Sequence, residues 1–295
     1  LELRSLTRKY YDLTDERSAH INKLKGDLHT VFPQYLDIFC DVTGKTSTMI
    51  LRQYGTPDKI LRGHKKTMIE KISKASRKGL AKASERYEKL CAAANAAKTF
   101  GCQIDSIYFN ISLTLDLVEK LDSALDSILN RIRQLITFNK NEKFIQQIKL
   151  LNTIPGVGFL TAVTIMCEIG DFSAFRNPKQ LFAYFGLDPE VNESGKFVGT
   201  QLHMSKRGSR IARRAIFAVA LASIRTKRNG EGINPYLRKY YELKSVQKPK
   251  MVAIGAVMHK VCNVVFAVLR DEKAFELRSP EEHCKQYQRP ALAAA

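Results

Sequence analysis

The sequence predicts a mainly α-helical protein, in which a long helical connector with a coiled-coil segment precedes a compact, mostly helical domain. Three observations predict this fold class. Apolar residues recur at three- and four-residue steps, no stretch alternates long enough for a large sheet, and glycine and proline become frequent from residue 150 onward. We therefore expect the connector over residues 1–149, the second domain over residues 150–290 and a tail over residues 291–295.

The connector begins with residues 1–31, whose leucines and tyrosines follow a helical period. This helix should end at Phe32, because the residue before a proline avoids the helical conformation. Residues 34–64 are broken by Gly44, Gly55 and Pro57 and predict shorter helices, whereas residues 65–100 are rich in lysine and alanine, which favours helix.

Residues 104–138 show the clearest periodicity. Their apolar residues alternate steps of three and four, the a/d spacing of a coiled coil over nearly three heptads. We expect a homo-oligomer, a dimer or a tetramer, to form through this coiled coil. A long helix of a bundle within one chain would show the same pattern, which consists of Val118, Leu121, Leu125, Ile128, Ile132 and Leu135.

The chain carries 48 lysines and arginines against 29 acidic residues, a formal net charge of +19. Such an excess attracts polyanions, so nucleic acid is the first candidate partner and an anionic membrane the second. The longest apolar run, residues 215–224, is too short to span a bilayer. Residues 251–269 are interrupted by polar side chains and indicate a buried helix, so we expect no membrane partner.

The six cysteines form no C-x-x-C pair, which is typical of reduced thiols in a cytoplasmic protein. A zinc site can be drawn from His259, Cys262, His283 and Cys284, but two helix-face residues and an unrelated tail pair explain them more simply. The acids are spread along the chain without the cluster that a two-metal nuclease needs. We expect no metal to be bound by this chain.

Gly156, Val157 and Gly158 form a turn between two helical patterns. Glycines let the backbone approach a phosphate, and the N–H groups that open the second helix would point at it. The turn resembles a helix-hairpin-helix motif that binds the DNA backbone. Close packing between helices is the alternative explanation for the glycines.

A basic helix follows, with Ser209 as its expected N-cap. Its cations share one face at i, i+3 and i+4, and two more precede the helix. This set can hold a scissile phosphate or a guide strand, and a solvated face is the alternative. The cations are Lys206, Arg207, Arg210, Arg213 and Arg214, and a second basic stretch covers residues 225–228.

Ser194 lies between Glu193 and Gly195, on a loop with an expected short hairpin around residues 195–202. A serine hydroxyl needs a base or a metal to become a nucleophile, and His203 is the one histidine nearby in the sequence. The local pattern alone is weak evidence for catalysis.

The order of these motifs resembles the C-terminal domain of the IS110 family of insertion-sequence transposases, relatives of the Piv DNA invertases. Residues 3–60 are similar to the helical connector of that family. The matching segments of the C-terminal domain are Ile154–Gly158, Phe182–Leu187 with Pro189, Glu193–Gly195, Met204–Lys206, Gly208 and Arg213–Ala215.

The resemblance implies a DNA transposase or site-specific recombinase, whose serine attacks the DNA phosphate and becomes linked to it. The family's serine falls on Ser194. Family members hold Mg²⁺ with acids of an N-terminal RuvC-like domain, and several pair DNA with a guide (bridge) RNA. We expect that domain to lie before residue 1 and this chain alone to be catalytically incomplete.

The expected partners are thus DNA and a guide RNA, in the cytoplasm of a bacterium or archaeon and near its nucleoid. The alternative from another class is a non-catalytic DNA- or RNA-binding adaptor that dimerises through its coiled coil.

Overall fold

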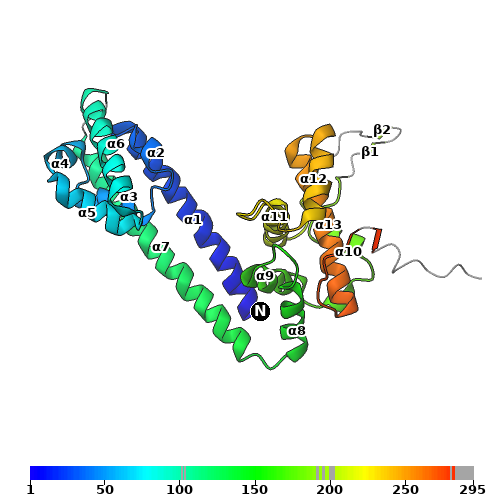
Figure 1. Ribbon diagram of the computed structural model, residues 1–295. Coiled ribbons are helices and arrows are strands. Elements are labelled where there is room, and N and C mark those ends of the chain that lie inside the picture. Colours follow the sequence, from blue (N-terminus) through cyan, green and yellow to red (C-terminus); the bar gives the residue numbers. More distant parts are fainter. Residues whose placement is uncertain are drawn as a thin grey trace, which may run out of the picture. The chain divides into compact units, whose positions relative to one another are not determined.

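The computed structural model describes residues 1–100, 102, 104–190, 203–279 and 281–282, and the backbone of strands β1 (Glu193–Ser194) and β2 (Phe197–Val198). This part of the chain holds thirteen α-helices and one short antiparallel strand pair (Figure 1), which confirms the predicted mainly α fold. Contacts divide the chain into two compact units. The connector unit is Tyr10–Asn130, and the C-terminal unit joins Leu1–Lys9 to residues from Arg131 onward.

Seven helices begin within the first 137 residues. The predicted first helix is confirmed and ends just before Phe32 and Pro33, and short helices follow it as expected. The lysine-rich stretch is two helices, because Arg77 takes a left-handed conformation and ends the first of them. The helices are α1 (Glu2–Val31), α2 (Tyr35–Ile38), α3 (Lys45–Gln53), α4 (Pro57–Arg62), α5 (Lys65–Ser76), α6 (Gly79–Phe100) and α7 (Asp105–Thr137).

The core of the connector unit gathers apolar side chains from α1 through α7. Phe32 and Tyr35 are fully buried at its centre, and the Tyr35 hydroxyl lies 2.9 Å from Ser47 Oγ. In this unit Arg17 of α1 pairs with Asp122 of α7. Tertiary packing of one helix face thus supplies most of the stability of these helices.

Three of the heptad positions of α7 are buried within the single chain: Val118, Leu125 and Ile132 are at most 8% exposed. Packing within one chain therefore accounts for much of the periodicity. Self-association through α7 stays a prediction.

The C-terminal unit is built around α13, which contacts α8, α10, α11 and α12. This helix is long and apolar enough to cross a membrane by composition, but ten of its side chains are buried in the unit, as expected of a core helix. The elements are α8 (Glu142–Leu151), α9 (Phe159–Ile169), the 3-10 helix η1 (Phe172–Ala174), α10 (Pro178–Tyr184), α11 (Arg210–Ile224), α12 (Pro235–Gln247) and α13 (Lys250–Asp271).

The composition changes near Leu150, whereas the contacts divide the chain between Asn130 and Arg131. The difference has a physical reason. Helix α8 contains no glycine or proline and resembles the connector in composition, yet it contacts α9 and α13 of the C-terminal unit.

Candidate nucleic-acid interface and active site

Helix α11 begins with the cap that the sequence predicts. The Ser209 hydroxyl accepts a hydrogen bond from the Ala212 N–H at 3.1 Å. Lys206, Arg207 and Arg210 are exposed around this end, and the first turn holds no acid. Cations at the positive end of a helix dipole repel it, so an anion bound there would relieve the repulsion.

A buried carboxylate lies behind this helix start. Glu168, on α9, has a side chain with no exposed surface, and it accepts hydrogen bonds from Arg8 at 2.8 and 3.0 Å. Arg4 donates two further hydrogen bonds, at 3.2 and 3.4 Å. The Ser209 hydroxyl is the third donor residue, at 2.7 Å. These bonds tie the first turns of α1 and the start of α11 to α9.

Burial alone would raise the pKa of Glu168, since it disfavours the charged form. The donors Arg8, Arg4 and Ser209 outweigh burial and lower the pKa of Glu168 to about 2. This carboxylate is therefore charged at neutral pH, with its hydrogen-bonding capacity filled by protein donors. It is a structural anchor that cannot exchange protons in a reaction near pH 7.

The two segments that hold Gly186 and Gly208 cross next to the start of α11. Gly186 has φ +66°, and a β-carbon there would lie 2.5 Å from the backbone nitrogen of Gly208. A β-carbon on Gly208 would collide with the carbonyl oxygen of Tyr184. The segments after α10 and before α11 therefore touch backbone to backbone, which only glycine allows.

Beyond this crossing the two segments continue as an antiparallel ribbon. The Ser205 N–H donates to the Asp188 carbonyl at 2.8 Å, and the Ser205 hydroxyl donates to the Asp188 carboxylate at 2.6 Å. The Glu190 N–H donates to the carbonyl of His203 at 2.7 Å. The ribbon thus leaves the unit from a base fixed at the start of α11.

The predicted nucleophile follows this ribbon in the sequence, in the strand pair of β1 and β2. Ser194 is in β1, paired with Phe197 of β2, so the hairpin begins two residues before its expected position. The side chain of Ser194 and the whole of Gly195 lie outside the described residues. Its role as nucleophile stays a prediction.

Arg213 was expected to face a phosphate. Its Nη1 donates to the Phe185 carbonyl at 3.1 Å, which braces the segment after α10. Arg213 and Arg214 are both half-buried, in contrast to the exposed Arg210. The basic helix is thus partly a support for the ribbon and partly an exposed cationic surface.

The glycine hairpin lies at the other end of α11. Gly156 has φ +97°, and a β-carbon there would lie 2.8 Å from Ser223 Oγ. The Ser223 hydroxyl donates to the Pro155 carbonyl at 3.0 Å, and Val157 is buried. Gly156 and Val157 therefore pack against the end of α11, and a phosphate contact at these two residues stays a prediction.

Gly158 differs from its neighbours. It is exposed, it caps α9 without a side-chain hydrogen bond, and a β-carbon there would meet nothing within 4 Å. The backbone at Gly158 is thus open to a phosphate. A phosphate contact there stays a prediction.

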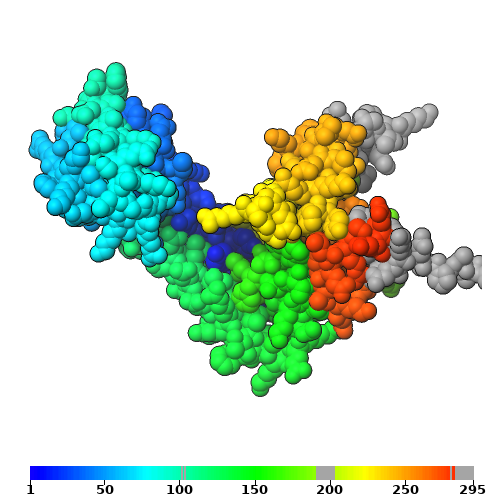
Figure 2. All heavy atoms as spheres, viewed as in Figure 1, coloured from blue at the N-terminus to red at the C-terminus, as the bar shows by residue number. Residues whose placement is uncertain are grey.

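The structure does not bring the hairpin and the start of α11 together. Thirteen residues of α11 separate Arg210 from Ser223, about 20 Å at 1.5 Å per residue. The second basic stretch, residues 225–228, is exposed and follows α11 at the hairpin's end, in the yellow loop that projects in Figure 2. Cations therefore flank both ends of α11.

Comparison with known proteins finds a similarity over part of the chain. Residues 148–242 match the family described as Transposase IS116/IS110/IS902 family, a segment that holds the ribbon, the hairpin and α11. This segment is thus similar to that transposase family.

Three relatives show how far the similarity extends. An IS110 insertion-element protein of Streptomyces coelicolor is 24% identical over 272 residues, 91% of this chain and 63% of that protein. The pilin gene-inverting protein of Moraxella bovis is 30% identical over 177 residues, 60% and 52% of the two chains. The transposase of IS1111A from Coxiella burnetii is 25% identical over 170 residues, 56% and 45%. The chain spans less than two thirds of each relative.

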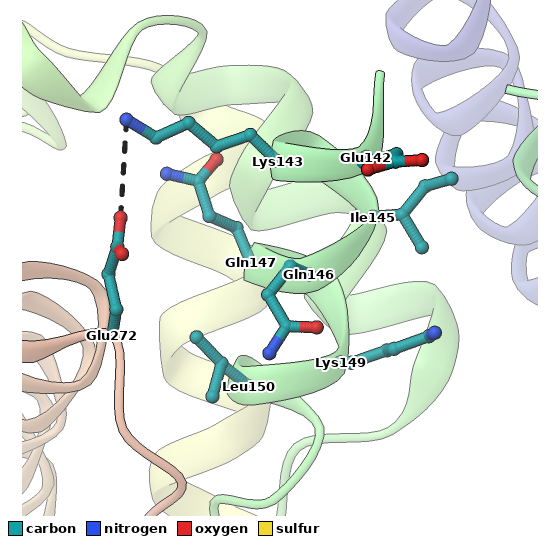
Figure 3. A pocket seen from close by; sticks show the side chains of 8 residues that line it. All are labelled: Glu142, Lys143, Ile145, Gln146, Gln147, Lys149, Leu150 and Glu272. Atoms are coloured by element: carbon teal, nitrogen blue, oxygen red, sulfur yellow. Dashed lines mark ion pairs between the residues drawn. The ribbon is translucent and has the colours of Figure 1, made fainter. Parts of the chain in front are cut away.

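A groove of about 730 Å³ lies between α8 and the end of α13 (Figure 3). Lys143 and Glu272 face each other across it at 4.0 Å, and Gln146 and Gln147 line it. None of the predicted nucleic-acid-binding residues, and no serine, is among its lining residues. The candidate site is therefore the start of α11 and its ribbon.

The family resemblance implies Mg²⁺, and the described residues do not fit it. Among them, no group of three or more His, Cys, Asp or Glu side chains could hold a metal ion. At the ribbon base, Glu168 and Asp188 already accept hydrogen bonds from protein donors. In the zinc alternative, the His259 ring lies against Phe182, while His283 and Cys284 are outside the described residues.

Sequence reasoning missed the buried contacts of Glu168 with Arg4 and Arg8. One signal could have found the carboxylate. Glu168 is the one charged residue in α9, whose other side chains are mostly apolar and buried. A buried acid needs cationic partners, which such a helix cannot provide itself.

Proposed function

We propose that this chain is the part of an insertion-sequence transposase, or of a related site-specific recombinase, that grips DNA and presents the attacking serine. The observation that carries the proposal is the ribbon base. The ribbon leaves from the crossing of Gly186 and Gly208, directly beside the exposed cations at the start of α11, and Ser194 follows it by four residues in the sequence. The family, whose members include transposases and a pilin gene-inverting protein, supports the same function.

The chemistry is a transfer of a phosphodiester to serine. The Ser194 oxygen forms a bond to the DNA phosphorus, and the bond from phosphorus to one deoxyribose oxygen breaks. The serine loses its proton, and the leaving oxygen ends as a hydroxyl. The DNA strand end stays linked to the protein until a second hydroxyl reverses the step, which is how strands are exchanged without loss of a phosphodiester.

The exposed cations hold the backbone on either side of that phosphate. Lys206, Arg207 and Arg210 contact phosphate oxygens, with Arg214 behind them on the same helix face. Arg213 keeps the ribbon segment in place through the Phe185 carbonyl. Gly158 offers a second backbone contact at the far end of α11, so a duplex running along α11 would touch both sites.

Covalent trapping tests the chemistry. Labelled DNA is incubated with Mg²⁺ and the chain, with and without a RuvC-like domain of a family member and the RNA that copurifies with the protein. A protein–DNA adduct that survives denaturation and disappears in Ser194→Ala supports the proposal. The matched control is Ser245→Ala, whose hydroxyl bonds within α12. An adduct that persists in Ser194→Ala would show that Ser194 is not the nucleophile. Salt-dependent binding without any adduct favours a non-catalytic adaptor.

Binding is tested separately with Arg207→Gln and Arg210→Gln combined. Loss of two phosphate contacts lowers the slope of log affinity against log salt by about 2 for duplex DNA. The control is Lys143→Gln with Lys149→Gln, on the exposed face of α8. Equal slopes for the two double variants would remove the start of α11 from the interface.

Two further parts of the proposal rest on family resemblance. A guide RNA would copurify with the chain and be recovered as one discrete sequence. A homo-oligomer would appear as a dimer or tetramer in light scattering. Heterogeneous RNA fragments, or a monomer at all concentrations, would count against each in turn.

A further inference from the structure

A second basic region lies in the connector unit, far in sequence from the motifs discussed above. Residues 59–98, which run from within α4 through α5 to near the end of α6, carry twelve lysines and arginines against three glutamates. A net excess of nine charges within forty residues is denser than the average of the chain. The region has no part in the proposed phosphodiester chemistry.

Some of these cations have acidic partners. Lys65 pairs with Glu88 at 2.7 Å and Lys89 with Glu85 at 2.8 Å, so two of the three glutamates are already engaged. Lys98 pairs with Asp58 at 2.8 Å. These exposed pairs hold neighbouring turns together and contribute little net charge to the surface.

Five cations at the turn between α5 and α6 differ from them. All are exposed, and within the described residues none forms an ion pair with a carboxylate. The Nζ atom of Lys71 lies 5.7 Å from the centre of the Tyr54 ring. Glu70, on α5, is the remaining glutamate of residues 59–98. The five are Lys71, Lys74, Arg77, Lys78 and Lys82, and we call them the α5–α6 cation cluster.

The cluster gathers at the corner between α5 and α6. Lys71 and Lys74 are three residues apart and share one face of α5. Arg77 and Lys78 lie in the turn after α5, and Lys82 lies in the first turn of α6, which packs against α5. Met68 and Ile72 are fully buried, so the inner side of α5 faces the core.

The start of α6 adds a second electrostatic argument. No acid lies in its first turn, while Lys82 does, and Arg77 and Lys78 come immediately before it. Cations next to the positive end of a helix dipole are unfavourable without an anion. All five side chains of the cluster are exposed to the solvent.

We propose that the α5–α6 cation cluster binds the phosphate backbone of a double-stranded nucleic acid, at a second site of the protein that is independent of Ser194. The contact is with phosphates. It carries no sequence preference, because the phosphate backbone is the same at every base pair. Duplex DNA and duplex RNA share this chemistry, and the test separates them.

The test removes four charges together in the full chain: Lys71, Lys74, Lys78 and Lys82 each to Gln. Binding to a 30-base-pair DNA duplex and to an RNA duplex of the same sequence is measured between about 50 and 200 mM salt. For four phosphate contacts, the affinity of the unaltered chain should fall over this range by roughly 100-fold more than that of the variant. The slope should drop by about 3 to 4.

The matched control changes three paired cations of the same unit, Lys65, Lys89 and Lys98, to Gln. Its slope should drop by less than half as much, and both variants should melt like the unaltered chain because the side chains are exposed. A change for both duplexes supports a shared phosphate site, and a change for one assigns the site to DNA or RNA. Slopes within 0.5 of the unaltered chain for both duplexes overturn the proposal, whatever Arg207→Gln with Arg210→Gln does.

Discussion

The two ends of α11 are both closed by glycine, but the glycines meet different partners. At the start of the helix, Gly186 and Gly208 press backbone against backbone. At its end, a β-carbon on Gly156 would lie 2.8 Å from the Ser223 hydroxyl oxygen and 3.1 Å from the Ser223 backbone nitrogen. A backbone cannot move aside without dragging its segment, whereas a hydroxyl can turn, so the first contact should tolerate change far less than the second.

The difference also separates two kinds of support. The start of α11 anchors the ribbon and rests on a buried ionic cluster. The end anchors a hairpin through one hydroxyl bond to Pro155. Substitutions can now rank these contacts, from the largest expected effect to the smallest.

Gly208→Ala should have the largest effect. Its β-carbon would overlap the Tyr184 carbonyl and lie 2.5 Å from the Gly186 nitrogen, so the ribbon base must separate. We expect a loss of more than about 4 kcal/mol in the unfolding free energy of the C-terminal unit, measured by urea denaturation. A loss below 1 kcal/mol would show that the crossing can open, and the comparison between the two ends would fail.

Glu168→Gln should follow closely. It leaves Arg4 and Arg8 facing a neutral, buried amide. The two arginine side chains are 37% and 47% exposed, so water screens the interaction, and the cost should lie at the low end of the range of about 3–5 kcal/mol for a buried pair. Glu242→Gln on α12 is the control: its carboxylate is 56% exposed and pairs with Arg238 one turn away, so about 0.5 kcal/mol is expected.

The same substitution predicts a pH dependence. The pKa of Glu168 is lowered to about 2 in the folded chain from 4.5, so its charge stabilises the fold fully above about pH 4.5. This stability disappears as the pH falls from 4.5 toward 2. The melting temperature of the unaltered chain should therefore drop more between pH 5 and pH 3 than that of Glu168→Gln. Parallel curves would mean that Glu168 is not the titrating group.

Gly156→Ala should cost less, about 2–3 kcal/mol. The φ of +97° is strained for alanine, and the β-carbon would push Ser223 Oγ away from the Pro155 carbonyl. Adding Ser223→Ala should recover part of the loss, because the obstructing hydroxyl is gone. No recovery would place the strain in the backbone alone.

Gly158→Ala should change the unfolding free energy least, within about 0.5 kcal/mol, since its β-carbon would meet open space. A phosphate contact at this backbone predicts a separate effect on DNA: Gly158→Asp should weaken duplex binding about tenfold by adding charge beside the phosphate. Unchanged binding would leave the hairpin as a packing device at both of its glycines.

Local signals in the sequence predicted several elements well. The proline after Phe32 marks the end of α1, and Ser209 caps α11, because each depends on neighbours within a few residues. The glycine pattern found the hairpin, but it could not say that Gly156 meets Ser223, which lies 67 residues away.

The buried cluster was out of reach for the same reason. Arg4 and Glu168 are 164 residues apart, and no periodicity relates them. The heptads of α7 show the opposite limit: a strong local pattern predicted the helix, but burial within one chain and burial between two chains leave the same signature. Contacts with distant residues or with a second chain decide which surface is buried, and a local pattern in one sequence does not identify those contacts.

Positive backbone φ angles occur at three non-glycine residues in the described part of the chain, and two of them are cations: Arg77 at +54° and Lys206 at +55°. One lies in the α5–α6 cation cluster and the other at the ribbon base. Glycine would fit either position with less strain, by up to about 1 kcal/mol. A cation in this conformation therefore lowers the stability of each surface slightly but places a charge at a tight bend. The variants Arg77→Gly and Lys206→Gly should have higher melting temperatures and bind DNA more weakly.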